Sequence, residues 1–199
     1  MSASDLADMQ YDLTTLRVTP CDAAADVLTW QVVRAIVAQH QLHCLRRSKT
    51  GLAAYRAYRK QITDEYDSMG DMVMERKLGY STDINPASGK LKAVPPSPPV
   101  ARTLFDSNDF PYYMDDGIEH HVLWIEGQPV TLELVRSLLH RHRDPALYDV
   151  LSFINPPHLQ SIPSVGHAHV ISRLKAYTAL DIKAQEAVRS AVRGESAAS

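Results

Sequence analysis

The chain has 199 residues, of which 45% are hydrophobic and 22% charged, and its formal net charge is -2. This length predicts one well-filled core, or one core with a helical appendage. The near-neutral charge argues against a nucleic-acid partner, because binding to the phosphate backbone needs clustered Lys and Arg. One short basic cluster is interpreted as a solvated helix end: Arg46, Arg47 and Lys49.

Neither a membrane span nor a secretory signal is expected. No segment approaches the roughly 18 consecutive apolar residues that a spanning helix needs. Residues 1–16 have no apolar run and are therefore not read as a signal peptide. Cys21 and Cys44 are predicted at opposite ends of one helix, too far apart for a disulfide. Two free thiols indicate a reducing compartment, and we expect the cytoplasm.

The first half of the chain is predicted to be helical. Thr19 can cap a helix and Pro20 suits its first position, and apolar residues at three- and four-residue steps extend this helix to about Arg47. Two more helices are predicted over residues 51–62 and 69–78. Residues 81–101 are interpreted as a loop or linker because their prolines exclude a continuous helix or central strand.

The second half indicates an antiparallel sheet. Strands are predicted over residues 120–125, 149–154 and 166–172, with a helix over 131–143. The fold class is therefore α+β, with an N-terminal helical layer packed on an antiparallel sheet. The predicted organisation is a disordered tail (1–17), one domain (18–180) made of a helical half (19–80), a Pro-rich loop (81–101) and a sheet half (102–180), and a C-terminal helix with a frayed tail (181–199).

Two histidines on one strand form the main candidate site. His167 and His169 are two residues apart, so both imidazoles lie on the same face of the predicted strand. Such a pair can bind a metal, or one ring can act as a nucleophile while the other orients a substrate. His120 or His121 can join that face if their strands pair. The alternative is a polar sheet surface without a function.

Other chemistries have less support in the sequence. A zinc site needs a third protein ligand beside the histidine pair, which His120 or His121 would have to supply. The chain contains neither the Gly-x-Ser-x-Gly elbow of serine hydrolases nor a glycine-rich phosphate loop. The paired acids Asp115 and Asp116 precede Gly117, which is typical of a turn.

Several sequence blocks resemble one family. They are Glu75-Arg76-Lys77-Leu78-Gly79-Tyr80, Asp109-Phe110-Pro111-Tyr112, Gly117-Ile118-Glu119-His120, Phe153-Ile154-Asn155-Pro156-Pro157 and His167-Ala168-His169-Val170. Together they look like the N-acetylglucosamine-induced proteins, a largely fungal and protist family of unknown biochemistry. The resemblance covers residues 25–173.

A more distant likeness concerns mechanism. Asn155, Gln160-Ser161 and His167-x-His169-Val170-Ile171 resemble the end of the histidine-triad superfamily, whose middle histidine attacks a nucleotide phosphate. Aligning Val170-Ile171 makes His167 the middle histidine and places Val165 where a first histidine is expected. The other register makes His169 the middle position and leaves Ile171 last.

The resemblance implies a phosphoryl or nucleotidyl transferase or hydrolase that acts on a nucleotide or sugar phosphate, with His167 and His169 as catalytic residues. The expected substrate-binding residues are Asn155, Gln160, Ser161, His120 and Trp124. One alternative is a non-catalytic binding protein for a phosphorylated metabolite. Another is a zinc enzyme using His120, His167 and His169. Neither a cofactor nor an oligomeric state is assigned.

Overall fold

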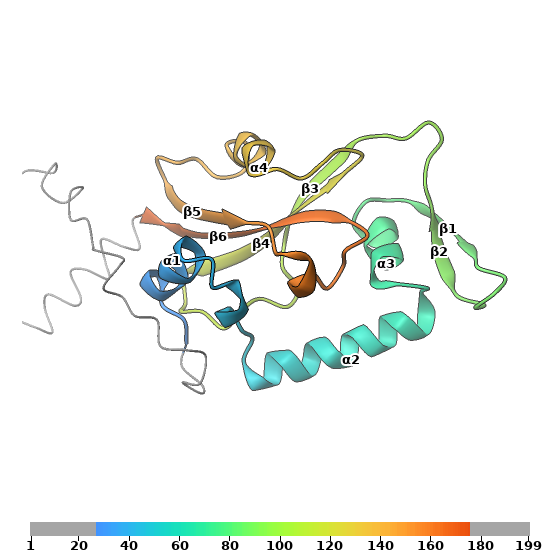
Figure 1. Cartoon of the computed structure of the whole chain (residues 1–199), viewed down its shortest axis with the longest axis horizontal. Helices are drawn as coiled ribbons and strands as arrows, with labels where there is room; N and C mark the ends of the chain where they lie inside the picture. Colours follow the sequence, from blue (N-terminus) through green and yellow to red (C-terminus); the bar gives the residue numbers. More distant parts are fainter. Residues whose placement is uncertain (1–26, 176–199) are drawn as a thin grey trace, which may run out of the picture.

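The computed structural model describes residues 27–175, which form an α+β fold (Figure 1). The predicted tail 1–17, the predicted C-terminal helix 181–199 and Cys21 lie outside the described residues. Within the described range, no helix is long and apolar enough to cross a membrane.

Each α-helix begins after a hydroxyl side chain that accepts a hydrogen bond from the backbone N–H three positions later. These N-caps are Thr29, Ser48, Ser68 and Thr131. The helices are α1 (Trp30–Ala38), α2 (Lys49–Glu65), α3 (Met69–Arg76) and α4 (Leu132–Leu139), and two 3-10 turns cover Leu42–Cys44 and Pro157–Leu159.

The main sheet is antiparallel and has the strand order β3-β4-β6-β5. Its strands are β3 (Arg102–Ser107), β4 (Ile118–Glu126), β5 (Tyr148–Phe153) and β6 (Gly166–Leu174). The three predicted strands correspond to β4, β5 and β6, so the expected fold class is confirmed. The fourth strand, β3, was not predicted.

Helices cover both faces of this sheet. In Figure 1, α4 lies above it, while α1 and α3 lie below at opposite ends and α2 runs farther out. The α4 face has one core around Leu123, Val135 and Val170. The other face has two cores: α3 packs on one that includes Trp124, and α1 packs on the other, which includes Phe153. The candidate site lies between these two cores.

The long first helix was predicted wrongly in its described part. Helix α1 ends at Ala38 instead of continuing to residue 47. His40 has a φ of 56°, a left-handed conformation that stops the helix, and a 3-10 turn follows. Cys44 lies buried in that turn. This break allows the chain to change direction before Ser48 starts α2.

The Pro-rich loop is also corrected, because its first part is a hairpin. Strands β1 (Ser81–Ile84) and β2 (Leu91–Val94) pair antiparallel in a separate two-stranded sheet. Pro86 lies in the turn between them, and the other prolines of this segment follow β2. Gly89 supplies a φ of +71° at the turn. Prolines at these positions interrupt no ladder hydrogen bond.

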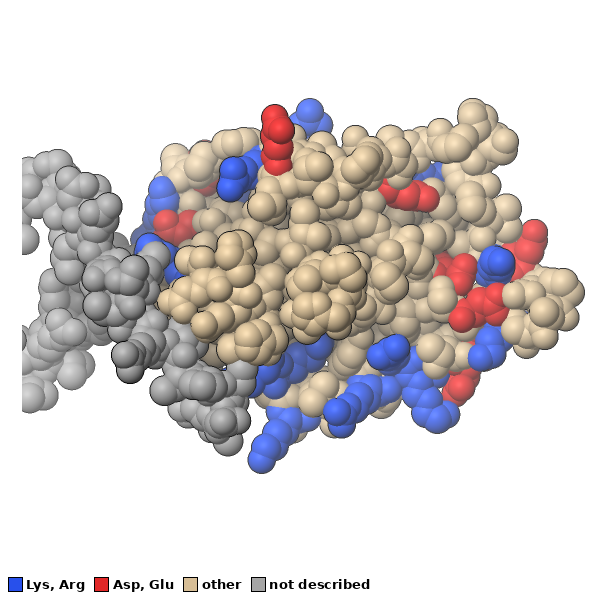
Figure 2. Space-filling model, in the orientation of Figure 1, with Lys and Arg blue, Asp and Glu red and all other residues tan. Residues whose placement is uncertain are grey.

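Basic side chains collect on the outer surface of α2. Figure 2 shows Lys and Arg along the lower edge of the molecule, where this helix runs. The exposed members are Lys49, Arg56, Arg59 and Lys60. Its other side carries Tyr55 and Tyr58, which are partly buried and turn toward the body of the protein.

Candidate functional site

The sheet register brings three histidines together. In β6, His167 and His169 lie two residues apart, opposite Trp124 and Val122 of β4. His120 lies diagonally across from His169, with Nε2 3.0 Å from its Nδ1. All three imidazoles are only 5–8% exposed. His121 lies on the other face, where Arg143 contacts its ring.

His167 has one nitrogen fixed and one available. Its Nδ1 lies 2.8 Å from the backbone carbonyl oxygen of Val165, which can only accept, so Nδ1 carries the proton. Burial lowers the pKa of His167 below its ordinary 6.5, and the ring is therefore neutral near pH 7. Nε2 then bears a lone pair and has no hydrogen-bond partner among the residues that the structure describes.

His169 uses both of its ring nitrogens. The backbone N–H of Tyr112, an obligate donor, contacts His120 Nδ1 at 3.2 Å, so His120 carries its proton on Nε2 and donates it to His169 Nδ1. His169 therefore holds its proton on Nε2, 3.0 Å from Nδ2 of Asn155. A 180° rotation of that amide presents Oδ1 as the acceptor. Asn108 Nδ2, at 3.2 and 3.5 Å from the two nitrogens of His120, lies beside the Cε1 edge of the ring.

His120, His169 and Asn155 form a hydrogen-bonded relay, and both of its imidazole rings are held neutral. Burial lowers the pKa of His169 to about 3, with further lowering by His167 and Arg47. Burial also holds the pKa of His120 well below 6.5. Phe153 stacks on His169 with ring centroids 5.2 Å apart. The relay is thus a rigid neutral support beside the free nitrogen of His167.

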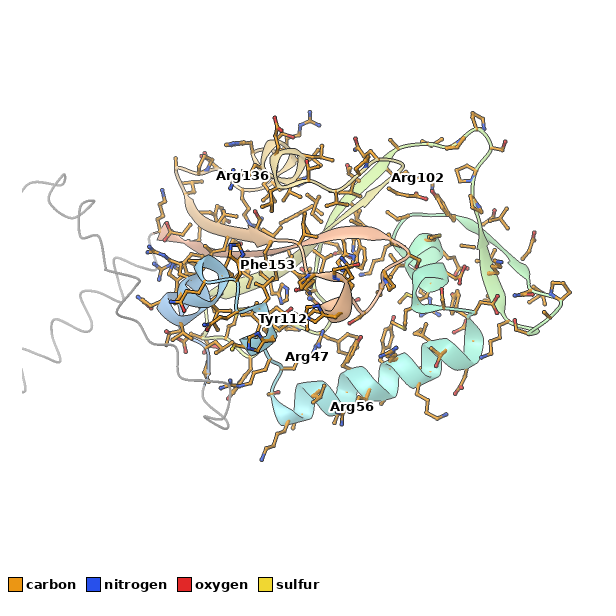
Figure 3. The ribbon with its side chains drawn as sticks, viewed as in Figure 1. Arg47, Arg56, Arg102, Tyr112, Arg136 and Phe153 are labelled. Carbon is orange, nitrogen blue, oxygen red and sulfur yellow. The ribbon has the colours of Figure 1, made fainter. Side chains whose placement is uncertain are left out.

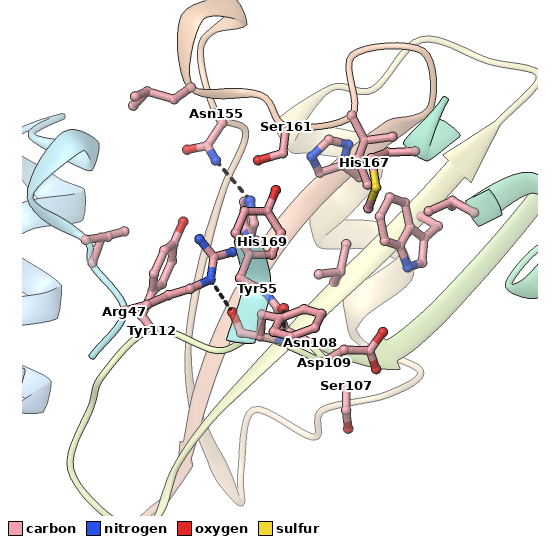
Figure 4. A pocket seen from close by; sticks show the side chains of 18 of the residues that line it. Arg47, Tyr55, Ser107, Asn108, Asp109, Tyr112, Asn155, Ser161, His167 and His169 are labelled. Carbon is pink, nitrogen blue, oxygen red and sulfur yellow. Dashed lines mark hydrogen bonds between the residues drawn. The ribbon is translucent and has the colours of Figure 1, made fainter. Parts of the chain in front are cut away.

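A cavity of about 260 Å³ opens in front of these histidines. Its walls come from the sheet, α2, α3 and the segment between β3 and β4 (Figure 4). Five predicted site residues line it, namely Trp124, Asn155, Ser161, His167 and His169. In Figure 4, Ser161 lies beside His167.

Three of the predicted binding residues differ in their relation to the cavity, namely Trp124, Gln160 and His120. Trp124 lines the cavity next to His167, with ring centroids 5.2 Å apart. Gln160 does not line the cavity and instead donates a 2.7 Å hydrogen bond to the backbone oxygen of Asn155. His120 lies behind His169 and also does not line it. Gln160 and His120 therefore contact residues that line the cavity and do not line it themselves.

Arg47 and Tyr55 also line the cavity but were not predicted. Arg47 was interpreted as part of a solvated helix end, whereas its side chain turns inward from the residue before the α2 N-cap (Figures 3 and 4). A usable signal existed: positions 47, 51, 55, 58 and 62 follow helical spacing, and 55, 58 and 62 form the apolar face of α2. An arginine continuing that face lies on its inner side.

The three histidines do not form a metal site. No group of three or more His, Cys, Asp or Glu residues within residues 27–175 is arranged to hold a metal ion. Nδ1 of His167 is directed at a backbone carbonyl, and the other two rings are hydrogen-bonded to each other. This geometry gives the zinc alternative no support.

Known proteins are similar to this chain over most of its length. The uncharacterized protein YPL067C of Saccharomyces cerevisiae is 30% identical over a 159-residue alignment that covers 71% of this chain and 77% of that protein. The crystal structure of HTC1 has a similar fold, with a TM-score of 0.51 and 24% identity over 73% of this chain and 85% of that chain. Residues 29–134 match the model of a family described as a protein of unknown function, DUF3605. They include Arg47, Tyr55 and His120 and end before His167. The chain belongs to the DUF3605 family.

Proposed function

We propose that the chain is a phosphoryl or nucleotidyl transferase or hydrolase of the histidine-triad type, with His167 as its nucleophile. The observation that carries this proposal is the state of His167. Its ring is neutral, its Nδ1 proton is fixed by Val165, and its Nε2 lone pair is free beside a cavity. A neutral imidazole is a competent nucleophile near pH 7.

The reaction would proceed in two displacements. Nε2 attacks the phosphorus, an N–P bond forms, and the leaving oxygen departs with the P–O electron pair and takes a proton from water. The imidazole keeps its Nδ1 proton, and the Val165 carbonyl stabilises the positive charge that develops on the ring. A water molecule or an acceptor hydroxyl then attacks the phosphorus, releases its proton to solvent and returns the N–P electron pair to Nε2.

The surrounding side chains suit this chemistry. The hydroxyl of Ser161 and the amide of Asn155 can donate to phosphate oxygens, because both line the cavity. His169 does not react in this scheme, since both of its nitrogens are engaged. It acts as a positioning residue through Asn155. This favours the register in which His167 is the middle histidine.

The likenesses to the histidine-triad superfamily and to the N-acetylglucosamine-induced proteins are part of this proposal. Val165 occupies the position where the histidine triad has its first histidine, and its backbone oxygen, not its side chain, contacts the nucleophile. The proposed substrate is a nucleotide or a sugar phosphate.

A binding protein is the second candidate. The same cavity, with Asn155 and Ser161 as donors on its lining, would hold a phosphorylated metabolite without any reaction. The missing third histidine favours this alternative, because the superfamily motif places three alternating imidazoles at its site. The two candidates differ in a single observable, a covalent bond to His167.

Phosphate-labelled nucleotides and sugar phosphates, incubated with the protein and quenched in alkali, would test the proposal. We expect an acid-labile phosphoramidate in the wild type and in His169→Ala, and none in His167→Ala. His158→Ala is the matched control, because His158 is exposed and does not line the cavity. Equal labelling of wild type and His167→Ala would contradict the nucleophile assignment. Ligand-induced stabilisation without turnover or labelling of any substrate would favour the binding protein.

A further inference from the structure

Arg47 carries a positive charge that no carboxylate among residues 27–175 pairs with. The six ion pairs within residues 27–175 use Lys60, Arg76, Lys77, Arg143 and Arg173, and none includes Arg47. Its Nε donates to the backbone oxygen of Phe110 at 2.9 Å, which leaves the two terminal nitrogens of the guanidinium. The group is part-buried and lines the cavity. A cation in this position is suited to an anionic ligand.

Tyr55 provides a second unused polar group in the same place. The guanidinium carbon of Arg47 lies 4.2 Å from the centre of the Tyr55 ring, so the two side chains are stacked. The Tyr55 hydroxyl is buried and has no hydrogen-bond partner in the part of the chain that the structure describes. An unpaired buried hydroxyl is costly, and proteins retain few of them. A ligand oxygen at this end of the cavity would satisfy it.

Another part of the cavity lining belongs to one apolar core. The side chains of Met69, Met72, Val73, Trp124 and Ile162 form this part. Methionine thioethers and an indole ring pack well against flat or irregular organic groups. This wall therefore suits an apolar or aromatic part of a ligand.

The second cation at the cavity is already neutralised. Lys77 Nζ lies 2.6 Å from a carboxylate oxygen of Asp106 and 3.2 Å from one of Asp109. Burial lowers the pKa of Lys77 while both carboxylates raise it, with a net rise, so the lysine stays charged and paired. Among the described residues that line the cavity, Arg47 is thus the one positive charge without an ion pair, and Asp109 on the lining repels further negative charge.

We propose that Arg47 and Tyr55 form an anion-recognition site for ligands with a single phosphate group, whose apolar or aromatic remainder lies against the wall containing Met72 and Trp124. The site shares its cavity with the proposed reaction, on which it rests for its role, but binding does not require His167 to react. A triphosphate carries several charges and needs more cations than this cavity offers. At about 260 Å³ the cavity is also smaller than most ligand sites, which favours a small ligand.

Calorimetric titrations with inorganic phosphate, phenyl phosphate, adenosine monophosphate and adenosine triphosphate would test this. We expect phenyl phosphate to bind more than about tenfold tighter than inorganic phosphate, because it adds about 1.4 kcal/mol or more of apolar contact. The monophosphate should bind more tightly than the triphosphate. Tighter binding of the triphosphate, or no binding of any probe, would overturn the proposal.

Three variants assign the binding to this site. Arg47→Met should weaken phenyl phosphate binding at least about tenfold, whereas Arg136→Met should not change it. Arg136 is exposed on α4, beyond the opposite face of the sheet (Figure 3), so it controls for the loss of one positive charge. If Arg47→Met does not fold, Arg47→Lys keeps the charge without the planar fork and should still bind more weakly than wild type.

Tyr55→Phe separates ligand recognition from folding. It should weaken binding while leaving the melting temperature of the free protein unchanged or higher, because it removes an unpaired buried hydroxyl. Equal affinities of Arg47→Met, Tyr55→Phe and wild type would overturn the inference. If His167→Ala still binds phenyl phosphate but no phosphohistidine forms in the wild type, the proposed reaction fails while the anion site stands.

Discussion

Nδ1 of His167 lies 2.8 Å from the backbone carbonyl oxygen of Val165, two residues earlier in the chain. This contact fixes both the tautomer and the direction of the ring without using another side chain. The free nitrogen is therefore oriented by the backbone at the start of β6. The reactivity of the site depends on this ring remaining neutral, which gives a prediction for its pH dependence.

The rate of any reaction that uses His167 should fall on the acid side with an apparent pKa below 6.5. Burial lowers the pKa of His167, so protonation, which removes the Nε2 lone pair, begins below the ordinary value for histidine. Measuring kcat/KM between about pH 5 and pH 8 checks this. An acid limb centred above pH 6.5 would show that the group is not this neutral, buried ring.

The tautomers of the three histidines should differ in a defined way. We expect His167 to carry its proton on Nδ1, and His120 and His169 to carry theirs on Nε2, because Val165 accepts from the first and the Tyr112 backbone donates to the second. Long-range nitrogen–proton NMR correlations of the imidazole rings distinguish these states. A proton on Nδ1 of His169 would reverse the relay, because Nε2 would then be an acceptor and the amide nitrogen of Asn155 would have to donate to it.

The free energy of unfolding should decrease as the pH falls below 6.5. His120 and His169 have pKa values lowered in the folded state, so the unfolded chain binds protons that the folded chain does not. Each contributes a loss of up to about 1.4 kcal/mol per pH unit in the window between pH 6.5 and its folded pKa. Above pH 6.5 the contribution is constant.

Urea denaturation at about pH 5, 6 and 7 measures this slope. All three pH values lie above the ordinary carboxylate pKa of about 4, so Asp and Glu contribute little to the change in the free energy of unfolding. His120→Gln should reduce the slope, since one of these groups no longer titrates. A stability independent of pH across this window would contradict the assigned neutral states.

Gly166 at the start of β6 should not tolerate a side chain. A Cβ there would lie 2.7 Å from the backbone oxygen of Ile125 and 2.6 Å from a methyl carbon of Val130. We expect Gly166→Ala to lose about 1–3 kcal/mol of stability, as overpacked sites do, and to weaken ligand binding through the displaced neighbour His167. Chemical denaturation and titration with phenyl phosphate measure the two effects.

Gly51→Ala is the matched control for that substitution. Its added Cβ would meet the Ser48 hydroxyl at 3.1 Å and the Arg47 Cβ at 3.7 Å, and a small shift relieves the first contact while the N-cap hydrogen bond is kept. Its stability should stay within about 0.5 kcal/mol of wild type. Equal effects of the two glycine substitutions would show that the close approach at Gly166 is not limiting.

Local patterns correctly predicted β4, β5 and β6 and the shared face of His167 and His169, because strand alternation is a local property. His167 and His169 share a face for the same reason that Ala168 and Val170 share the other. The role of β3 was missed, because Arg102–Ser107 directly follows the prolines and its burial does not alternate cleanly. The hairpin of β1 and β2 was not predicted because the high proline content of this segment argues against strands. The prolines lie in the turn and after β2, where they do not interfere with pairing.

The anion site could not be placed from local patterns alone. Arg47 belongs to a connection between helices, and Tyr55 to a helix that lies far from β6 in the sequence. They meet the histidines only because α1 ends early and the chain turns before α2. That turn depends on His40 and on the burial of Cys44, which are tertiary features. Local patterns also could not decide whether His120 or His121 joins His167 and His169, because this depends on the register of β4 against β6.

His120 and His121 are neighbours in the chain but lie on opposite faces of β4. A shift of β4 by one residue against β6 would exchange them, because every side chain of a strand then changes face. It would place Val122 and Trp124 under α4 and break the contacts of His120 with Tyr112 and His169. The same imidazoles that prepare the cavity for a ligand therefore discriminate against misaligned strands during folding.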